Sequence, residues 1–318
     1  MNPTVHLAPM AGITDQVFRR LCFENGCDWA TTEMVSAQGF LTAPPDRNAY
    51  RFLLARYADE GSLGVQIFGA DPLYMAQAAE RLTGLGLFDR IDINMGCPAQ
   101  KVVGGQSGSA LMKDPDLAAR IVEQVKKSTV LPVTVKMRLG WDAEHVNAVP
   151  FARLMEQAGA DGLTVHGRTR AQQYAGKADW QKIAQVKQAV RIPVIANGDI
   201  VDGPSALQAL QITGCDGVAV GRGALGRPWV FAEIQAALAG RPYTPPPYSH
   251  IVDTAMRHAR EMAAWKGERS ALLEMRKHFT WYTFGRRGAA QVRIRINQAD
   301  SFDEVEALLR SLAQNSPR

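Results

Sequence analysis

Short apolar runs recur along the first three quarters of the chain, and each is long enough to form one buried strand of a parallel sheet. Segments with helical spacing lie between most of them. Asp71-Pro72 and Asp114-Pro115 open two such segments, because aspartate caps the free N–H groups of a helix and proline suits its first position. The apolar runs cover residues 5–11, 29–35, 63–69, 90–96, 132–138, 162–168, 192–198 and 217–223.

Eight strands that alternate with helices predict an α/β fold of the (β/α)8 TIM-barrel type over residues 1–240, rather than a doubly wound sheet. An internal repeat supports this prediction. Residues 159–168, GADGLTVHGR, resemble residues 214–222, GCDGVAVGR. Similar βα units in succession are what a barrel is made of.

The pattern changes after residue 240. Four prolines lie within residues 242–247, which neither a helix nor a central strand accommodates, so we expect a stiff linker over residues 241–248. Helical spacing follows at residues 250–265, 270–282 and 302–312, without further strand patterns. The sequence therefore predicts a small all-α helical domain over residues 249–318.

Positive charge is concentrated in this second domain. The whole chain has a net charge of +5, yet residues 1–240 carry 23 basic and 23 acidic side chains. Residues 241–318 carry 13 basic and 8 acidic ones. A neutral body with a basic tail suggests a polyanionic partner for the tail, although charge alone fits a merely basic surface equally well.

The bulk composition excludes several classes of protein. No apolar run approaches the ~18 residues of a membrane span, and the N-terminus lacks the pattern of a signal peptide, so we expect a cytoplasmic protein. The four cysteines do not have the spacing of a metal site. We expect no metal, a monomeric chain, and buried free thiols at Cys22, Cys27 and Cys215.

Polar residues stand where the predicted strands end, which is where a TIM barrel has its active site. Charged groups are seldom buried without a purpose, although a core lysine paired with an acid remains an alternative for Lys136. The residues at these strand ends are Gln66, Asn94, Cys97, Lys136, Arg138, His166, Arg168, Asn197, Asp199 and Arg222.

The last two strands form the usual phosphate site of this fold. Gly198 and Gly221 allow close approach of backbone N–H groups, and Arg222 can bind phosphate oxygens with two N–H groups. Residues 221–226, GRGALG, match G-x-G-x-x-G. They follow the last strand instead of the first and lack an acid ~20 residues further on, which favours phosphate binding within the barrel over a Rossmann unit.

A phosphate site with Lys136 nearby suits FMN, because a lysine stabilises the negative charge that reduced flavin carries near N1 and O2. Cys97 can then act as an acid in the reduction of a C=C bond, since a thiol of pKa ~8.5 is protonated at neutral pH. The glycines of the following loop would let it swing toward substrate. The alternative is a nucleophilic Cys97 with His166 as its base.

Five motifs occur in order along the barrel, and a sixth, RKHFTWY, lies in the tail at residues 276–282. Together they resemble the tRNA-dihydrouridine synthase (Dus) family, most closely the bacterial B-type enzymes. The barrel motifs are PMAGITD (9–15), INMGCP (93–98), HGRTR (166–170), VIANGDI (194–200) and VGRGALGRPW (220–229).

This resemblance implies that FMN binds in the barrel and that NADPH is the electron donor. It implies reduction of the uracil C5=C6 bond of a uridine in the D-loop of tRNA. Hydride would pass from flavin N5 to C6, and Cys97 would donate the proton to C5.

The resemblance also implies roles for individual residues. Asn94 would touch the uracil, with Arg168 beside that site. Trp281 and Tyr282 would stack on bases or, as the favoured alternative, pack between tail helices. The implied FMN ligands are Pro9, Met10, Ala11, Gln66, Lys136, His166, Asn197, Gly198, Asp199, Gly221 and Arg222. The candidate tRNA contacts of the tail are Lys266, Arg269, Arg276, Lys277, Arg286, Arg287, Arg293 and Arg295.

Two other functions fit parts of the pattern. An FMN-dependent reductase of free pyrimidines, similar to dihydroorotate dehydrogenase, would share the barrel and its thiol but would have no use for a basic helical tail. A non-catalytic RNA-binding protein would be colourless and would have no need of Cys97, Lys136 and Arg222.

Overall fold

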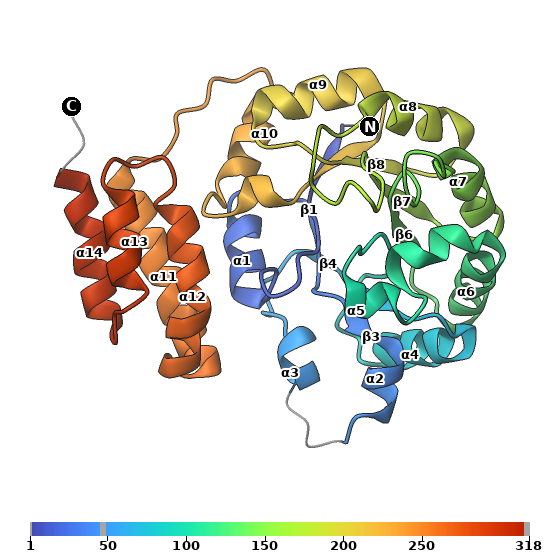
Figure 1. The fold of residues 1–318 in the computed structure, drawn as a ribbon, viewed down its shortest axis with the longest axis horizontal. Helices are drawn as coiled ribbons and strands as arrows, with labels where there is room; N and C mark the ends of the chain where they lie inside the picture. The colour runs from blue at the N-terminus through green and yellow to red at the C-terminus, as the bar shows by residue number, and fades with distance from the viewer. Residues whose placement is uncertain (1, 45–48, 315–318) are drawn as a thin grey trace.

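The computed structural model describes residues 2–44 and 49–314. In these ranges nine parallel strands form one sheet in the order β2-β1-β9-β8-β7-β6-β5-β4-β3, and a further pairing of β2 with β4 closes it into a barrel (Figure 1). The predicted TIM barrel is therefore confirmed. The strands are β1 (Thr4–Leu7), β2 (Trp29–Thr31), β3 (Val35–Ser36), β4 (Ser62–Phe68), β5 (Arg90–Met95), β6 (Val133–Met137), β7 (Gly162–His166), β8 (Val194–Asn197) and β9 (Gly217–Val220).

Nine strands fill eight barrel positions because the predicted strand over residues 29–35 is split in two. Both parts, β2 and β3, pair with β4. At the break, the Gln66 backbone N–H donates to the Thr32 hydroxyl at 3.1 Å instead of to a backbone carbonyl. A side chain thus replaces one rung of the ladder and interrupts the strand.

Helices surround the barrel, and aspartates begin several of them as predicted. The Asp71 carboxylate accepts from the N–H groups of Leu73 and Tyr74, and Asp114 accepts from Leu117. The helices of this part are α1 (Gln16–Glu24), α2 (Ala37–Thr42), α3 (Ala49–Leu53), α4 (Pro72–Gly84), α5 (Gln100–Val103), α6 (Pro115–Ser128), α7 (Ala148–Gln157), α8 (Trp180–Ala189), α9 (Gly203–Thr213) and α10 (Val230–Leu238), with 3₁₀ turns η1 (Gly108–Lys113) and η2 (Arg222–Ala224).

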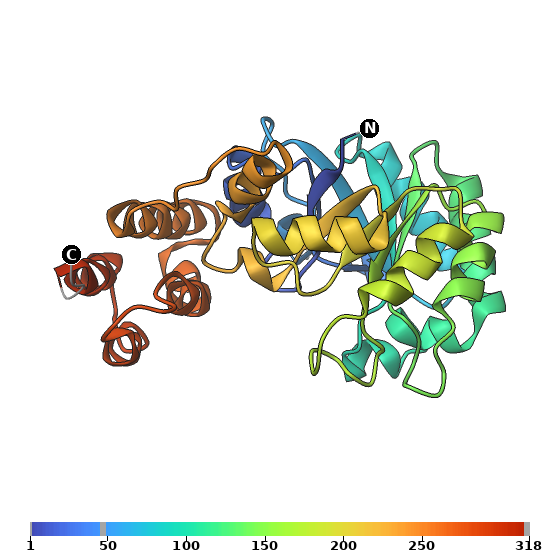
Figure 2. The same ribbon diagram turned by 90° about the horizontal axis from the view of Figure 1, so that it is seen from above.

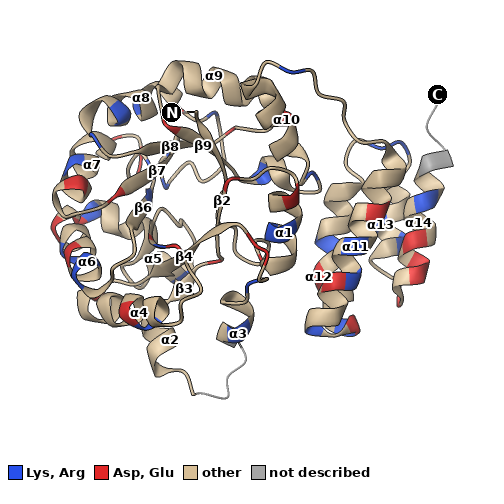
Figure 3. Cartoon of the chain, turned by 180° about the vertical axis from the view of Figure 1, so that it is seen from behind, with Lys and Arg blue, Asp and Glu red and all other residues tan. Residues whose placement is uncertain are grey.

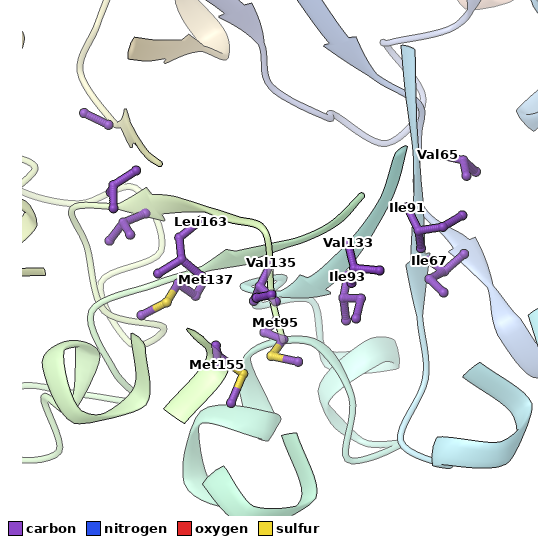
Figure 4. Close-up of a cluster of buried hydrophobic side chains, with 14 of the residues drawn as sticks. Val65, Ile67, Ile91, Ile93, Met95, Val133, Val135, Met137, Met155 and Leu163 are labelled. Carbon is purple, nitrogen blue, oxygen red and sulfur yellow. The ribbon is translucent and has the colours of Figure 1, made fainter. Parts of the chain in front are cut away.

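The barrel strands divide their side chains by alternation. Apolar residues at odd positions, such as Val133, Val135 and Met137 of β6, are fully buried, and Figure 4 shows them in a cluster with Met155 of α7. The even positions between them, including Lys136, are polar. Because successive side chains of a strand point to opposite faces, the apolar set packs against the helices and the polar set faces the barrel interior.

The second part of the chain is a bundle of helices that lies beside α1 (Figures 1 and 2). Its described helices are α11 (Tyr248–Lys266), α12 (Glu268–Tyr282), α13 (Ala289–Ile296) and α14 (Phe302–Gln314). Residues 241–247 contain neither helix nor strand, and α11 begins at Tyr248, one residue before the expected domain start. The expected domain end, residues 315–318, lies outside the described residues.

An apolar contact joins barrel and bundle. Phe18 of α1 packs against the rings of His258 and His278, with centroid distances of 5.8 and 5.9 Å, and all three side chains are buried. Arg257 of α11 binds the Glu24 carboxylate at 2.6 Å. The bundle is therefore docked on the barrel and not merely tethered to it. In the described part of the chain, no helix is both long and apolar enough to cross a membrane.

Candidate active site

A cavity of about 1110 Å³ opens at the C-terminal ends of the barrel strands, where this fold places its active sites. It slightly exceeds the range of about 300–1,000 Å³ that is usual for ligand sites. All the expected FMN ligands line it, together with Asn94 and Cys97. One lining residue, Phe284, comes from the helical bundle. The mouth is thus shared by both parts of the chain.

A chain of hydrogen bonds fixes the polar side chains of β4, β5 and β6. Asp92 accepts from Gln66 Nε2 at 2.7 Å and from Thr134 Oγ1 at 2.6 Å, and Asn94 Nδ2 donates to Gln66 Oε1 at 2.8 Å. Burial raises the pKa of Asp92. Because every bond has a defined donor, the network sets the orientation of both amides.

The same network positions Cys97. Asn94 Oδ1 accepts from the backbone N–H groups of Gly96 and Cys97 at 3.1 and 2.9 Å. The Cys97 carbonyl accepts from the Ser109 hydroxyl at 2.9 Å, and residues between them form α5 and the start of η1. The loop is therefore folded and anchored, and the half-buried thiol lines the cavity. A swing of Cys97 toward bound substrate stays a prediction.

The nucleophile alternative for Cys97 finds no base in this arrangement. Over residues 2–44 and 49–314, no hydrogen bond reaches its thiol. Burial first, then Lys136 and three arginines, lower the pKa of His166 to about 2, so its imidazole is neutral at physiological pH. A neutral His166 can bind a ligand by hydrogen bonding but is a poor base.

Lys136 is a cation without an acidic partner. Its ammonium donates to Asn197 Oδ1 at 3.1 Å, and no Asp or Glu among the described residues forms an ion pair with it. Burial, followed by the Arg138 charge, lowers the pKa of Lys136 to about 8, so it remains mostly protonated at pH 7. The paired-core alternative is not supported, and the charge is available to an anionic ligand.

Arg168 contacts two cavity residues, His166 and Asp199, and its expected place beside the substrate site stays a prediction. Its side chain is 2% exposed and does not line the cavity. Its guanidinium binds both oxygens of Asp199 at 2.8 Å and the carbonyls of Ala175 and Gly176. This position supports a role in holding Asp199 and the loop after β7, rather than direct contact with substrate.

The end of the cavity near β8 and β9 has the features of a phosphate site. Gly198 has φ +111°, and a Cβ there would lie 2.8 Å from His166 and Ala178. A Cβ on Gly221 would meet nothing closer than 3.9 Å, so its absence leaves space beside the backbone. Arg222 is 52% exposed and lies over the Tyr174 ring at 4.5 Å, 3.7 Å from Asp199.

Each of the three glycines in residues 221–226 is explained by a different physical requirement. Gly221 leaves room at the cavity. A Cβ on Gly223 would lie 2.6 Å from the Ile200 carbonyl oxygen, so it allows two barrel loops to pack closely. Gly226 has φ +66°, and a Cβ there would lie 2.4 Å from the backbone of Trp281 in α12. The last glycine therefore serves the junction with the helical bundle and not a nucleotide.

A family model described as "Dihydrouridine synthase (Dus)" matches residues 6–316 of this chain. The chain belongs to the Dus family. A "Probable tRNA-dihydrouridine synthase" of Rhodobacter capsulatus is 44% identical over 98% of this chain and 95% of its own length. Proteins called "tRNA-dihydrouridine synthase B" in Xanthomonas campestris and Pseudomonas aeruginosa are 42% and 41% identical, over 97% and 96% of this chain and 92% and 91% of theirs. The resemblance found in the sequence motifs is therefore confirmed.

The basic residues of the tail in this Dus protein occupy several environments. Lys277 donates to the Gly12 carbonyl beside the cavity, Arg286 lies over the Tyr248 ring at 4.4 Å, and Arg293 donates to Thr283. Arg287 and Arg295 are exposed. Both signs of charge occur on the bundle (Figure 3), but no acid lies between residues 275 and 299. The basic excess is therefore confined to the end of α12, the following turn and α13.

Sequence reasoning missed Tyr174 and Phe284 as cavity residues. Both lie in loops without a motif, so only the folded chain brings them to the mouth. Tyr282 is 3% exposed and packs in the bundle, in line with the favoured alternative of helix packing. The buried free thiols Cys22, Cys27 and Cys215 are as predicted. No group of three His, Cys, Asp or Glu in the described ranges could hold a metal ion.

Proposed function

We propose that this protein is an FMN-dependent tRNA-dihydrouridine synthase that uses NADPH to reduce a D-loop uridine of tRNA to 5,6-dihydrouridine. The observation that carries the proposal is one cavity lined by a thiol, a lysine without an ion pair, and a glycine next to an arginine. The names of the bacterial relatives supply the substrate. A tRNA substrate further implies that the protein acts in the cytoplasm. We also expect it to be a monomer.

The residues present fit FMN. Gly221 leaves free space beside Arg222, which suits a phosphate, and Pro9, Met10 and Ala11 give the cavity an apolar wall. Lys136 and His166 face the same space with one cation and one neutral donor. When bound and reduced by NADPH, FMN supplies a hydride to uracil C6.

Cys97 would supply the proton that the neighbouring carbon needs. As a C5–H bond forms, the Sγ–H bond breaks and its electrons remain on sulfur as a thiolate. Lys136 and Arg138 place positive charge near that sulfur, and solvent would return a proton to it. Asn94, held by Gln66, fixes the Cys97 backbone and so the position of the donor.

The tRNA substrate is favoured over a free pyrimidine because the helical bundle contributes to the mouth of the cavity. Phe284 lines it, and the acid-free segment in which Phe284 lies, residues 275–299, carries the basic excess of the chain. A reductase of small pyrimidines would have no use for these basic residues beside the cavity. Backbone contacts with RNA would instead offset the cost of extruding the base, which is a few kcal/mol.

The full chain, supplied with FMN and NADPH, should convert an unmodified tRNA transcript to a product two hydrogens heavier at one uridine, as mass spectrometry of RNA digests would show. The purified protein should be yellow. Equal rates with free uridine would support the free-pyrimidine alternative, and a colourless protein that binds tRNA would support the non-catalytic one.

A further inference from the structure

Phe284 lies in the turn between α12 and α13 and combines two properties. Its side chain is 82% exposed, and it lines the active-site cavity. A single exposed apolar residue needs no explanation by itself. An aromatic ring from a second domain that lines the candidate active-site cavity is a different case, because a ligand bound there can contact it.

The backbone around Phe284 is held in place from two sides. Trp281 and Tyr282 pack against Gly226, where a Cβ would lie 2.4–2.6 Å from their backbone atoms. Arg293 of α13 donates to the Thr283 hydroxyl at 3.0 Å and to its carbonyl at 3.2 Å. The Phe284 N–H donates to the Trp281 carbonyl at 3.1 Å. The ring therefore projects from a fixed turn.

The surroundings of Phe284 are cationic. The segment from residue 275 to residue 299 contains six basic residues and no acid, and Arg286 and Arg287 follow Phe284 almost directly. On the barrel side, Lys101 and Arg170 line the same cavity. An aromatic ring among cations at a cavity mouth is the arrangement by which proteins bind unpaired nucleotides, with stacking on the base and charge on the phosphates.

We infer that Phe284 stacks on an unpaired base of the RNA next to the uridine that enters the cavity. This inference rests on the proposed function. The stack would replace part of the base stacking that the RNA loses when the uridine is extruded, and so it would strengthen binding of the substrate rather than the chemical step. Phe284 would be a substrate-positioning residue contributed by the helical domain.

Steady-state kinetics on the full chain with an unmodified tRNA transcript test this inference. Phe284→Ala should raise KM for tRNA by roughly five- to a hundred-fold, with kcat at saturating tRNA changed much less. Phe284→Trp should restore KM, whereas Phe284→Leu should not. Affinity should fall without a change in its salt dependence, because no charge is removed. Leu273→Ala, which removes an exposed apolar residue of α12 away from the cavity, is the matched control.

Two results would overturn the inference. If the wild type is active and Phe284→Ala has the same KM for tRNA, the ring does not bind the RNA. A raised KM for NADPH with an unchanged KM for tRNA would assign the ring to the dinucleotide. A wild type that forms no dihydrouridine in any tRNA would instead refute the proposed function.

Discussion

At the scale of single residues, Cys97 is the proton donor that we propose. Cys97→Ala removes the proton donor and leaves the remaining cavity walls in place. We expect turnover on tRNA to fall by about 10²–10⁴-fold while FMN content and tRNA affinity stay near those of the wild type. Dihydrouridine formation, flavin absorbance and filter binding measure the three quantities.

Cys215→Ala is the matched control, since Cys215 is a buried free thiol outside the cavity. It should keep its turnover. Turnover by Cys97→Ala above a tenth of the wild-type rate would exclude this thiol as the proton donor.

Lys136 links stability to pH in the ligand-free protein. Its pKa is about 8 in the fold, against an ordinary value of 10.5, so the unfolded chain binds more protons between these two pH values. The penalty for burying the charge is therefore complete below pH 8 and disappears as pH rises toward 10.5. Lys136→Met should raise stability at pH 7 by on the order of 1 kcal/mol, a value reduced because the ammonium faces an open cavity.

Thermal unfolding of both proteins without FMN, at pH 7 and pH 10, measures this effect. The stabilisation should be largest at pH 7 and small at pH 10. A difference in Tm between the two proteins that does not change with pH would show that burial does not destabilise the charged form of Lys136.

The sequence revealed most of the cavity residues because they end strands in a fold with a known active-site face. It placed Gln66, Asn94 and Lys136 correctly at the mouth. Arg168 has the same strand-end position, but its side chain binds Asp199 and does not line the cavity. Side-chain direction beyond the end of a strand depends on partners from other loops, which spacing does not encode.

At the scale of elements, the contact between the loop after β9 and the end of α12 depends on Gly226. Gly226→Ala would add a Cβ at 2.4 Å from the Trp281 backbone and would also strain a residue at φ +66°. Left-handed backbone costs about 1–2 kcal/mol and overpacking about 1–3 kcal/mol. We expect a loss of at least about 2 kcal/mol in the free energy of unfolding, with weaker binding of tRNA.

Gly240→Ala separates the cost of the left-handed backbone from the cost of overpacking. Gly240 has φ +64°, and nothing lies within 4 Å of the position that its Cβ would occupy. It should show the backbone cost alone and bind tRNA normally. Equal losses for the two variants in urea unfolding would mean that contact with α12 contributes nothing.

Element prediction was reliable where the pattern was long and unreliable where tertiary contacts decide. Seven of the eight expected strands appear as single elements. The remaining one, over residues 29–35, is split into β2 and β3 where the Thr32 hydroxyl accepts a backbone hydrogen bond of β4. The short helix α13 was missed because only Ala289, Val292 and Ile296 are buried on it. Residues 292–296 (VRIRI) alternate between apolar and basic residues, which is not the helical period.

At the scale of the whole molecule, the basic excess should act as an electrostatic anchor for tRNA. Arg287 and Arg295 are exposed in the acid-free segment of the bundle. Each lost phosphate contact reduces the slope of log K against log salt by about 0.7–0.9. The double variant Arg287→Gln/Arg295→Gln should therefore lower this slope by roughly 1.5 in filter binding over a range of salt concentrations.

Arg260→Gln/Arg310→Gln removes the same net charge from arginines that are paired with Glu306. This control should leave the slope almost unchanged. Similar effects of the two double variants would show that net charge, and not a defined RNA-binding face, governs the affinity.

The sequence by itself determined the barrel, the change to a helical tail, the face on which the strand-end residues gather, and the family. These features follow from local patterns, since the alternation of polar and apolar residues and the order of motifs are written along the chain. Only the tertiary structure decided that the bundle docks on α1 through Phe18, that Gly226 fixes the end of α12, and that Phe284 reaches the cavity. These contacts join residues far apart in the chain, and their geometry depends on how two separately formed surfaces fit together.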